Sequence, residues 1–266
     1  MAGAVVITRP LAQARPLAAR VAALGRAVEV LPLLDITPLP QATELLAALA
    51  RLAEPTPYYQ LVAFVSPNAI DAAFAHIKSV PPGVTWAVVG EGSRLALAAH
   101  GVNNENARIV SPSDTAHSDS EHLLQTLDLA ALRDRKALII RGDGGRELLA
   151  DGLRAAGAVV DVVPAYRRSV PALTPLLEAT LRRLLERDND WLITSSEALR
   201  GLYAWLAELD ARAPGAALSC VVAMQQQHLI VPHARIAETA QNLGFSRITL
   251  TGSGDERLLA ALQSRL

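Results

Sequence analysis

One stretch decides the fold: Lys136–Arg168, which reads KALIIRGDGGRELLADGLRAAGAVVDVVPAYRR. An apolar run leads into a glycine-rich turn, an amphipathic segment ends at Gly157, and a second apolar run follows. This order predicts a strand, a helix with a glycine stop, and a second strand. The same order occurs in Ala4–Ile36, which reads AVVITRPLAQARPLAARVAALGRAVEVLPLLDI and places Gly25 over Gly157. The two stretches indicate an internal duplication.

The duplication continues through the rest of the chain. Leu61–Ile70 aligns with Asp190–Leu199, which puts Ser66 over Ser195. Predicted strands alternate with predicted helices, and the strands are apolar throughout rather than at every second residue. That pattern favours parallel sheets covered by helices on both faces. The sequence therefore predicts an α/β protein with two doubly wound parallel-sheet domains related by duplication.

Two proline-punctuated passages, Leu31–Pro40 and Val163–Pro171, follow the second strand of each repeat. Such spacing disfavours a helix and suits an extended linker. If the chain crosses between domains at both passages, residues 1–34 and 169–266 form one domain and residues 38–162 the other. Residues 35–37 and 163–168 would then be a two-stranded linker beside a cleft between the domains. Two sequential domains are the alternative.

Composition restricts the classes of function. The chain has 266 residues, 51% of them hydrophobic, and a formal net charge of −1, which gives no general attraction to nucleic acid or anionic membranes. The single cysteine, Cys220, indicates a reducing compartment. Neither a signal peptide nor a membrane-spanning run is recognisable. We expect a cytoplasmic protein with no nucleic-acid or membrane partner.

Polar and glycine residues follow the predicted strands where each helix begins. Parallel sheets bind ligands at the carboxyl ends of their strands, and helix N-termini there favour anions. The candidate anion-binding residues are Thr8, Arg9, Ser66, Asn68, Gly90, Ser93, Arg141, Gly142, Gly144, Ser195, Ser196 and His233. Ordinary helix capping is the alternative explanation for each of them.

Other chemistries find little support. The turns at Gly90, Gly142 and Gly252 lack the third glycine of a dinucleotide-binding fingerprint, so we expect no cofactor. A polar loop gathers potential metal ligands, but without usual spacing, and we expect no metal there. Those residues are Asp114, His117, Asp119, Glu121 and His122. Cys220 is predicted to lie in a strand, residues 220–223, as a core residue.

Tyr166 is one of four tyrosines and lies on the second extended passage. A phenol beside a binding site can donate a proton or a hydrogen bond to a leaving group. The alternative is an aromatic residue that packs the linker, because tyrosine readily buries its ring while its hydroxyl stays in water.

Five segments in this order resemble the uroporphyrinogen-III synthase family: Val6–Pro10, Phe64–Ile70, Val88–Ser93, Ile140–Glu147 and Pro164–Arg168. The resemblance covers essentially the whole chain. It implies two α/β domains joined by two extended strands, a monomer, and no cofactor or metal. It also implies a linear tetrapyrrole substrate, hydroxymethylbilane, which carries eight carboxylates. The family's reaction removes the hydroxyl as water and closes the ring with the terminal pyrrole inverted, through a spiro intermediate.

By the same resemblance, Tyr166 assists departure of the hydroxyl, and the preceding deaminase is a potential transient partner. The turn at His233 departs from the family pattern, because Val231–Ala234 replaces a usual Gly-Pro-Ser/Thr-Thr turn. This puts its hydroxyl contacts in doubt but leaves its backbone donors. Two other classes remain open. One is a hinged two-domain protein that binds small anions without chemistry, and the other is a sugar- or nucleotide-processing enzyme.

Overall fold

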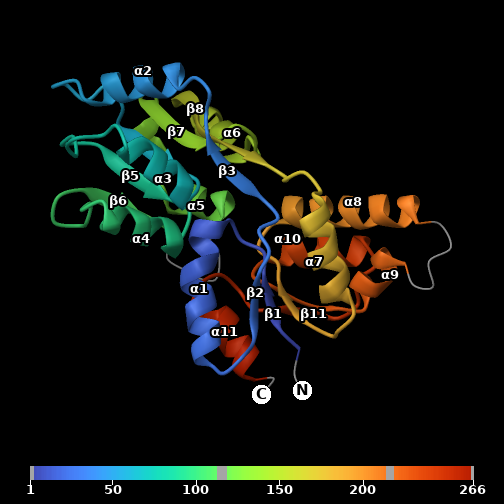
Figure 1. The fold of residues 1–266 in the computed structure, drawn as a ribbon. Helices are drawn as coiled ribbons and strands as arrows, with labels where there is room; N and C mark the ends of the chain where they lie inside the picture. Colours follow the sequence, from blue (N-terminus) through green and yellow to red (C-terminus); the bar gives the residue numbers. More distant parts are fainter. Residues whose placement is uncertain (1–2, 113–118, 214–218, 265–266) are drawn as a thin grey trace. The chain divides into compact units, whose positions relative to one another are not determined.

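The computed structural model describes residues 3–112, 119–213 and 219–264 (Figure 1). The chain divides into two compact units. The first comprises Met1–Asp35 with Ser169–Leu266, and the second comprises Ile36–Arg168. Each unit contains one sheet.

The sheet of the first unit has five parallel strands in the order β11-β10-β9-β1-β2. Their bounds are β1 Val5–Ile7, β2 Val28–Val30, β9 Asp190–Leu192, β10 His228–Val231 and β11 Ile248–Leu250. Renumbered along the chain, this is the 2-1-3-4-5 order of a doubly wound sheet.

Helices cover both faces of this sheet. One face packs against α1 (Leu11–Ala23) and α11 (Asp255–Gln263). The other packs against α7 (Pro175–Leu185), α8 (Ser196–Arg212), α9 (Cys220–Gln225) and α10 (Ala234–Asn242). Successive side chains of a strand point to opposite faces, so Val5 and Ile7 join the first cluster while Val6 joins the second.

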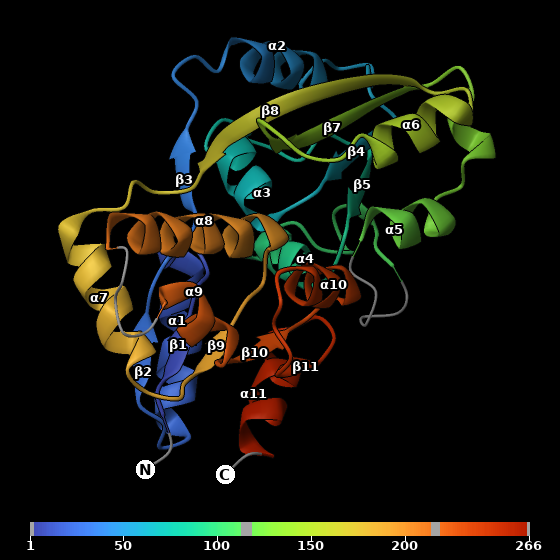
Figure 2. The same cartoon turned by 90° about the vertical axis from the view of Figure 1, so that its right-hand side faces the viewer.

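The sheet of the second unit has six strands in the order β3-β8-β7-β4-β5-β6, and the five from β8 to β6 pair in parallel. Their bounds are β3 Asp35–Pro38, β4 Leu61–Phe64, β5 Thr85–Val88, β6 Arg108–Val110, β7 Lys136–Gly142 and β8 Val159–Ser169. Helices α2 (Thr43–Leu52), α3 (Pro67–Phe74) and α4 (Glu91–Ala99) cover one face. The other face carries α5 (Ser120–Thr126), the short helix η1 (Ala130–Leu132) and α6 (Leu148–Ala155). Figure 2 shows α5 and α6.

The two sheets share one design, which confirms the predicted fold class. Strands β2-β1-β9-β10-β11 correspond in order to β8-β7-β4-β5-β6. The sequence repeat pairs the same strands, since it aligns β1 and β2 with β7 and β8, and β9 with β4. Each repeat therefore gives its first two strands to one sheet and its last three to the other.

The two extended passages lie in the six-stranded sheet. Residues 35–37 belong to β3, and residues 163–168 form the end of β8 next to it. Strand β8 also pairs with β7 as far as Tyr166, which lies opposite Gly142. The position of Tyr166 is therefore fixed by backbone pairing.

The prediction of a strand at residues 220–223 is wrong, because Cys220–Gln225 is helix α9. Its start is fixed by capping: the Ser219 hydroxyl accepts the Val222 N–H, and the Asp210 carboxylate accepts the N–H groups of Cys220 and Val221. A short apolar run is compatible with either a buried strand or a buried helix. Cys220 is buried, as expected.

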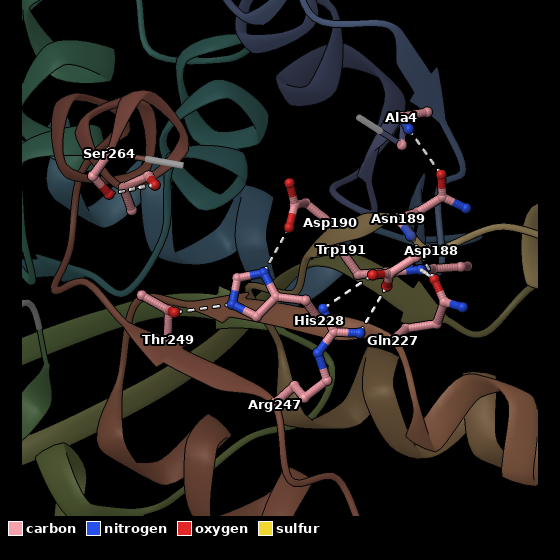
Figure 3. A network of polar contacts seen from close by, with 12 residues as sticks. Ala4, Asp188, Asn189, Asp190, Trp191, Gln227, His228, Arg247, Thr249 and Ser264 are labelled. Carbon is pink, nitrogen blue, oxygen red and sulfur yellow. Dashed lines mark hydrogen bonds and ion pairs between the residues drawn. The ribbon is translucent and has the colours of Figure 1, made fainter. Parts of the chain in front are cut away.

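A buried polar network links the strands at the amino-terminal edge of the five-stranded sheet (Figure 3). His228 lies with Nδ1 2.6 Å from the Asp190 carboxylate and Nε2 2.9 Å from the Thr249 hydroxyl. Arg26 donates to Asp190 at 2.8 Å and to the carbonyl of Gly3. Buried polar groups that find partners in this way specify the register of the strands.

Across residues 3–112, 119–213 and 219–264, the search for a helix apolar and long enough to cross a membrane finds none.

Candidate functional site

In the first unit, the carboxyl ends of β1 and β9 lie side by side, and from there the chain winds in opposite directions. Ligands bind at such switch points of doubly wound sheets. Thr8 follows β1 and is 2% exposed, and its hydroxyl donates to the Leu192 carbonyl at 2.7 Å. The hydroxyl proton therefore joins the two strands. The Thr8 backbone is paired as well, because its N–H donates to the Leu192 carbonyl at 3.4 Å and its carbonyl accepts the Leu33 N–H at 3.2 Å.

Arg9 is held by an ion pair at the same edge. Its Nη1 lies 2.6 Å from the Asp255 carboxylate, in the first turn of α11, and the side chains are 17% and 33% exposed. An anionic ligand at Arg9 has to share this guanidinium with Asp255 or displace it. The glycine-rich turn before α11 was visible in the sequence, but the ion pair between Arg9 and Asp255 was not.

The other predicted hydroxyls of this unit, those of Ser195 and Ser196, lie at the start of α8. The Ser195 hydroxyl caps α8 by accepting the Ala198 N–H at 3.3 Å, and the Ser196 hydroxyl accepts from Thr239 at 3.1 Å. His233 precedes α10 without a side-chain cap, and its Nε2 lies 3.5 Å from the Ser253 hydroxyl. Capping is therefore part of what Ser195 does, whereas the Ser196 hydroxyl links α8 to α10.

In the second unit, the corresponding switch point lies between β7 and β4. The Ser66 hydroxyl caps α3 by accepting the Ala69 N–H at 3.2 Å, and Asn68 is the second residue of that helix. Gly90 precedes α4 as its N-cap, and Ser93 lies in the first turn, 3% exposed.

Tyr166 comes to this switch point from β8. Its side chain is 5% exposed and packs in the core beneath α3 and α4, while its hydroxyl lies 3.0 Å from the Ser66 hydroxyl. Its ring lies against Gly142, where a Cβ atom would come 3.0 Å from Cζ and 3.2 Å from the hydroxyl oxygen. A β-bulge at Arg141/Gly142 accompanies this contact. The structure thus brings together three predicted residues that are far apart in sequence.

The charged residues of the β7–α6 turn are paired within the turn or with the end of β8. Arg141 donates to the Glu147 carboxylate and to the Arg146 carbonyl. Asp143 accepts from the backbone N–H of Arg168 and from the Arg167 side chain, each at 3.2 Å. Gly144 is exposed, with open space around its Cα. This turn therefore offers a ligand its backbone groups, and its charged side chains are already partly neutralised by ion pairs.

The helix starts differ in electrostatics. Among the described helices, α1, α3 and α10 carry no acidic residue in their first turn, whereas α4 carries Glu91 and α8 carries Glu197. The N-terminus of a helix carries a partial positive charge that an acidic residue in the first turn compensates. The starts of α1, α3 and α10 are thus the better sites for an external carboxylate.

The polar loop that gathers potential metal ligands is only partly described. Asp114 and His117 lie outside the described residues. The Asp119 carboxylate caps α5 and lies 2.6 Å from His122 Nδ1, and Glu121 pairs with Arg146, whose hydrogen bond lowers the pKa of that carboxyl. No group of three potential metal ligands occurs in the part of the chain that the structure describes.

The fold and these edges define a class: a two-unit, duplicated α/β protein whose candidate ligand groups lie at the carboxyl ends of parallel strands. The family model described as Uroporphyrinogen-III synthase HemD matches residues 15–247. The chain therefore belongs to the uroporphyrinogen-III synthase family, which works in tetrapyrrole biosynthesis.

Two curated relatives support the assignment. The chain is 32% identical to the uroporphyrinogen-III synthase of Salmonella typhimurium over 268 positions, which span 97% of this chain and 99% of the relative. It is 31% identical to that of Escherichia coli, again over 97% of this chain and 99% of the relative.

Among solved structures, a mutant uroporphyrinogen III synthase from Thermus thermophilus has a TM-score of 0.61 at 15% identity, and the match covers 99% of both chains. The Helicobacter pylori protein has a TM-score of 0.57 at 14% identity, over 99% of this chain and all of its own. These structures support the fold.

Proposed function

We propose that this chain converts hydroxymethylbilane into uroporphyrinogen III, as a lyase that releases one water and inverts the terminal pyrrole. One observation carries the proposal: two relatives named for this synthase match the chain over 97% of its length. The candidate residues at the carboxyl edges of both sheets are compatible with such a substrate.

The substrate carries eight carboxylates, and helix N-termini are suited to hold them. Backbone N–H groups in a first turn lack partners within the helix and point along its axis. We expect substrate carboxylates to bind at the starts of α1 and α3, beside Arg9 and Asn68, and at the start of α10, after His233. Each contact is made in the ground state as well as in the transition state, so its loss should raise KM.

The chemical step needs a leaving hydroxyl to depart with a proton. In the proposed step, the Tyr166 hydroxyl donates a hydrogen bond or a proton to that oxygen, the carbon–oxygen bond breaks, and water leaves. The resulting azafulvene is attacked by the terminal pyrrole, and the spiro intermediate rearranges to the inverted ring. The terminal pyrrole loses its α-proton when the ring closes, and this proton replaces the one that Tyr166 gave to the leaving hydroxyl. Proton donation by a positioned side chain contributes about 10²- to 10⁴-fold in rate.

The rest of the rate enhancement is proposed to be conformational. The bilane also cyclises without enzyme, to the isomer without inversion, so the protein has to hold the reacting ends in the less accessible arrangement. Such positioning can contribute about 7–11 kcal/mol. We propose that the protein does this as a monomer in the cytoplasm, without a cofactor, on bilane supplied by the preceding deaminase.

An isomer-resolved assay tests the function. Hydroxymethylbilane is generated in situ, the purified chain is added, and the type III and type I uroporphyrinogens are separated. The proposal expects type III to dominate, and the reaction without the chain to give type I. If only type I forms while the chain still binds the bilane, the non-catalytic binding protein is the correct assignment.

A further inference from the structure

Ser66 makes two contacts with one hydroxyl group. Its Oγ accepts the Ala69 N–H at 3.2 Å and lies 3.0 Å from the Tyr166 hydroxyl. A serine hydroxyl has one proton and two lone pairs. The helix cap uses one lone pair, so the contact with Tyr166 uses either the proton or the remaining lone pair.

We propose that Ser66 is a positioning residue that donates its proton to the Tyr166 oxygen and leaves the phenolic proton for the substrate. The inference rests on the role proposed above for Tyr166. Accepting the Ala69 N–H polarises the Ser66 hydroxyl and makes it a better donor, as in other hydrogen-bonded chains. The α3 N-terminus, which has no acidic residue in its first turn, strengthens the same polarisation.

Packing leaves the Tyr166 side chain little freedom to move its hydroxyl away from Ser66. Its side chain is 5% exposed, and Gly142 lies directly against Cζ and the hydroxyl oxygen. The position of the phenol oxygen is therefore fixed, and only the direction of its O–H bond within the ring plane can vary. A hydrogen bond received from Ser66 directs the phenolic proton away from that serine.

The duplication separates the two roles of this serine. Ser195 is the counterpart of Ser66 and caps α8 at 3.3 Å in the same manner. The residue that aligns with Tyr166 is Leu34, which is 5% exposed in an apolar cluster. The cap is thus kept in both units, whereas the described residues of the first unit offer no tyrosine to the capping serine. The contact with Tyr166 is an addition to a conventional cap.

The test compares Ser66→Ala with Ser66→Thr, each with Tyr166 and with Tyr166→Phe. Thr174→Ala is the matched control, because Thr174 caps α7 at 3.2 Å and also precedes a proline at the helix start. We expect Ser66→Ala to lower kcat about 3- to 10-fold, with little change in KM, since one oriented hydrogen bond is lost. Ser66→Thr should restore kcat, and in Tyr166→Phe protein Ser66→Ala should have no further effect. Thr174→Ala should lower stability without lowering kcat.

A spectroscopic measurement makes the result independent of turnover. With ¹³Cζ-labelled tyrosine, the Tyr166 resonance is assigned by its loss in Tyr166→Phe protein. Ser66→Ala should move that resonance, and Thr174→Ala should not. A resonance that stays in place, or equal kcat losses with and without the phenol, would overturn the positioning role. Failure of the proposed function has a different signature, which is the absence of enzyme-dependent type III isomer from the wild-type protein.

Discussion

Gly142 lies opposite Tyr166 in the register of β7 and β8, and a Cβ atom on it would come within 3.0 Å of the tyrosine Cζ. The glycine is required here by space rather than by backbone conformation. A ring atom of a buried tyrosine has little freedom to withdraw, because the core around it is close-packed.

Gly142→Ala should therefore displace the Tyr166 ring. We expect a loss of about 1–3 kcal/mol in the free energy of unfolding, as for other overpacked cores, and a fall in kcat for the type III isomer. Urea unfolding and the isomer assay measure the two effects. Gly144→Ala is the control for the ring, because the space around Gly144 is open, and it should leave the Tyr166 ¹³Cζ resonance unchanged. A Gly142→Ala protein with wild-type stability and resonance contradicts the contact.

Asp255→Asn should strengthen binding of the anionic substrate if Arg9 is a ligand. The change removes a carboxylate that lies 2.6 Å from the Arg9 guanidinium. A partly exposed ion pair is worth about 0.2–1 kcal/mol, so KM should fall by up to about fivefold. Arg9→Ala should raise KM, and steady-state kinetics measure both.

Glu256→Gln is the matched control for that experiment. It removes the same charge from the same first turn of α11, but Glu256 pairs with Arg20 and is 84% exposed. Its KM should equal that of the wild type. If Asp255→Asn and Glu256→Gln change KM equally, the effect comes from overall charge and Arg9 is not the ligand.

Asp210→Asn should destabilise the protein in a pH-dependent way. Burial opposes ionisation of Asp210, but donation from the Ser219 hydroxyl and from the N–H groups of Cys220 and Val221 outweighs it and holds the pKa of this carboxyl below its ordinary value. A depressed native pKa stabilises the fold above the unfolded pKa of about 3.9, and this stability is lost as the pH falls through the native pKa.

We expect Asp210→Asn to cost about 1–2 kcal/mol at pH 7, and the difference from wild type to shrink as the pH falls below about 4. Urea unfolding at a series of pH values measures this. Asp151→Asn is the control, since Asp151 forms an exposed pair with Arg154 and should cost less than about 0.5 kcal/mol. A difference that does not vary with pH would argue against an ionised Asp210 cap.

The fold could be predicted because its signals are local and repeated. Apolar runs followed by capped helices, and the alignment of Ala4–Ile36 with Lys136–Arg168, indicate parallel sheets and their duplication. The error at residues 220–223 has a physical reason. Four apolar residues carry no periodicity, and the Asp210 carboxylate that starts α9 belongs to another helix.

From the sequence, the site could be predicted only as a set of positions at strand ends, without the contacts between them. Strand ends located Ser66 and Arg9, but their partners Tyr166 and Asp255 are 100 and 246 residues away in sequence. Contacts of this kind depend on strand register and on the bulge at Gly142, which a single sequence does not encode locally.

The most direct test of the account is the rate and isomer composition of the product formed by Tyr166→Phe protein. The substitution removes the hydroxyl but keeps the aromatic ring that packs on Gly142, so the stability of the protein and its KM should be close to those of the wild type. We predict that enzyme-dependent formation of the type III isomer falls at least about 100-fold, and that the type I isomer from unassisted cyclisation replaces it. Unchanged turnover to the type III isomer would contradict the role of Tyr166.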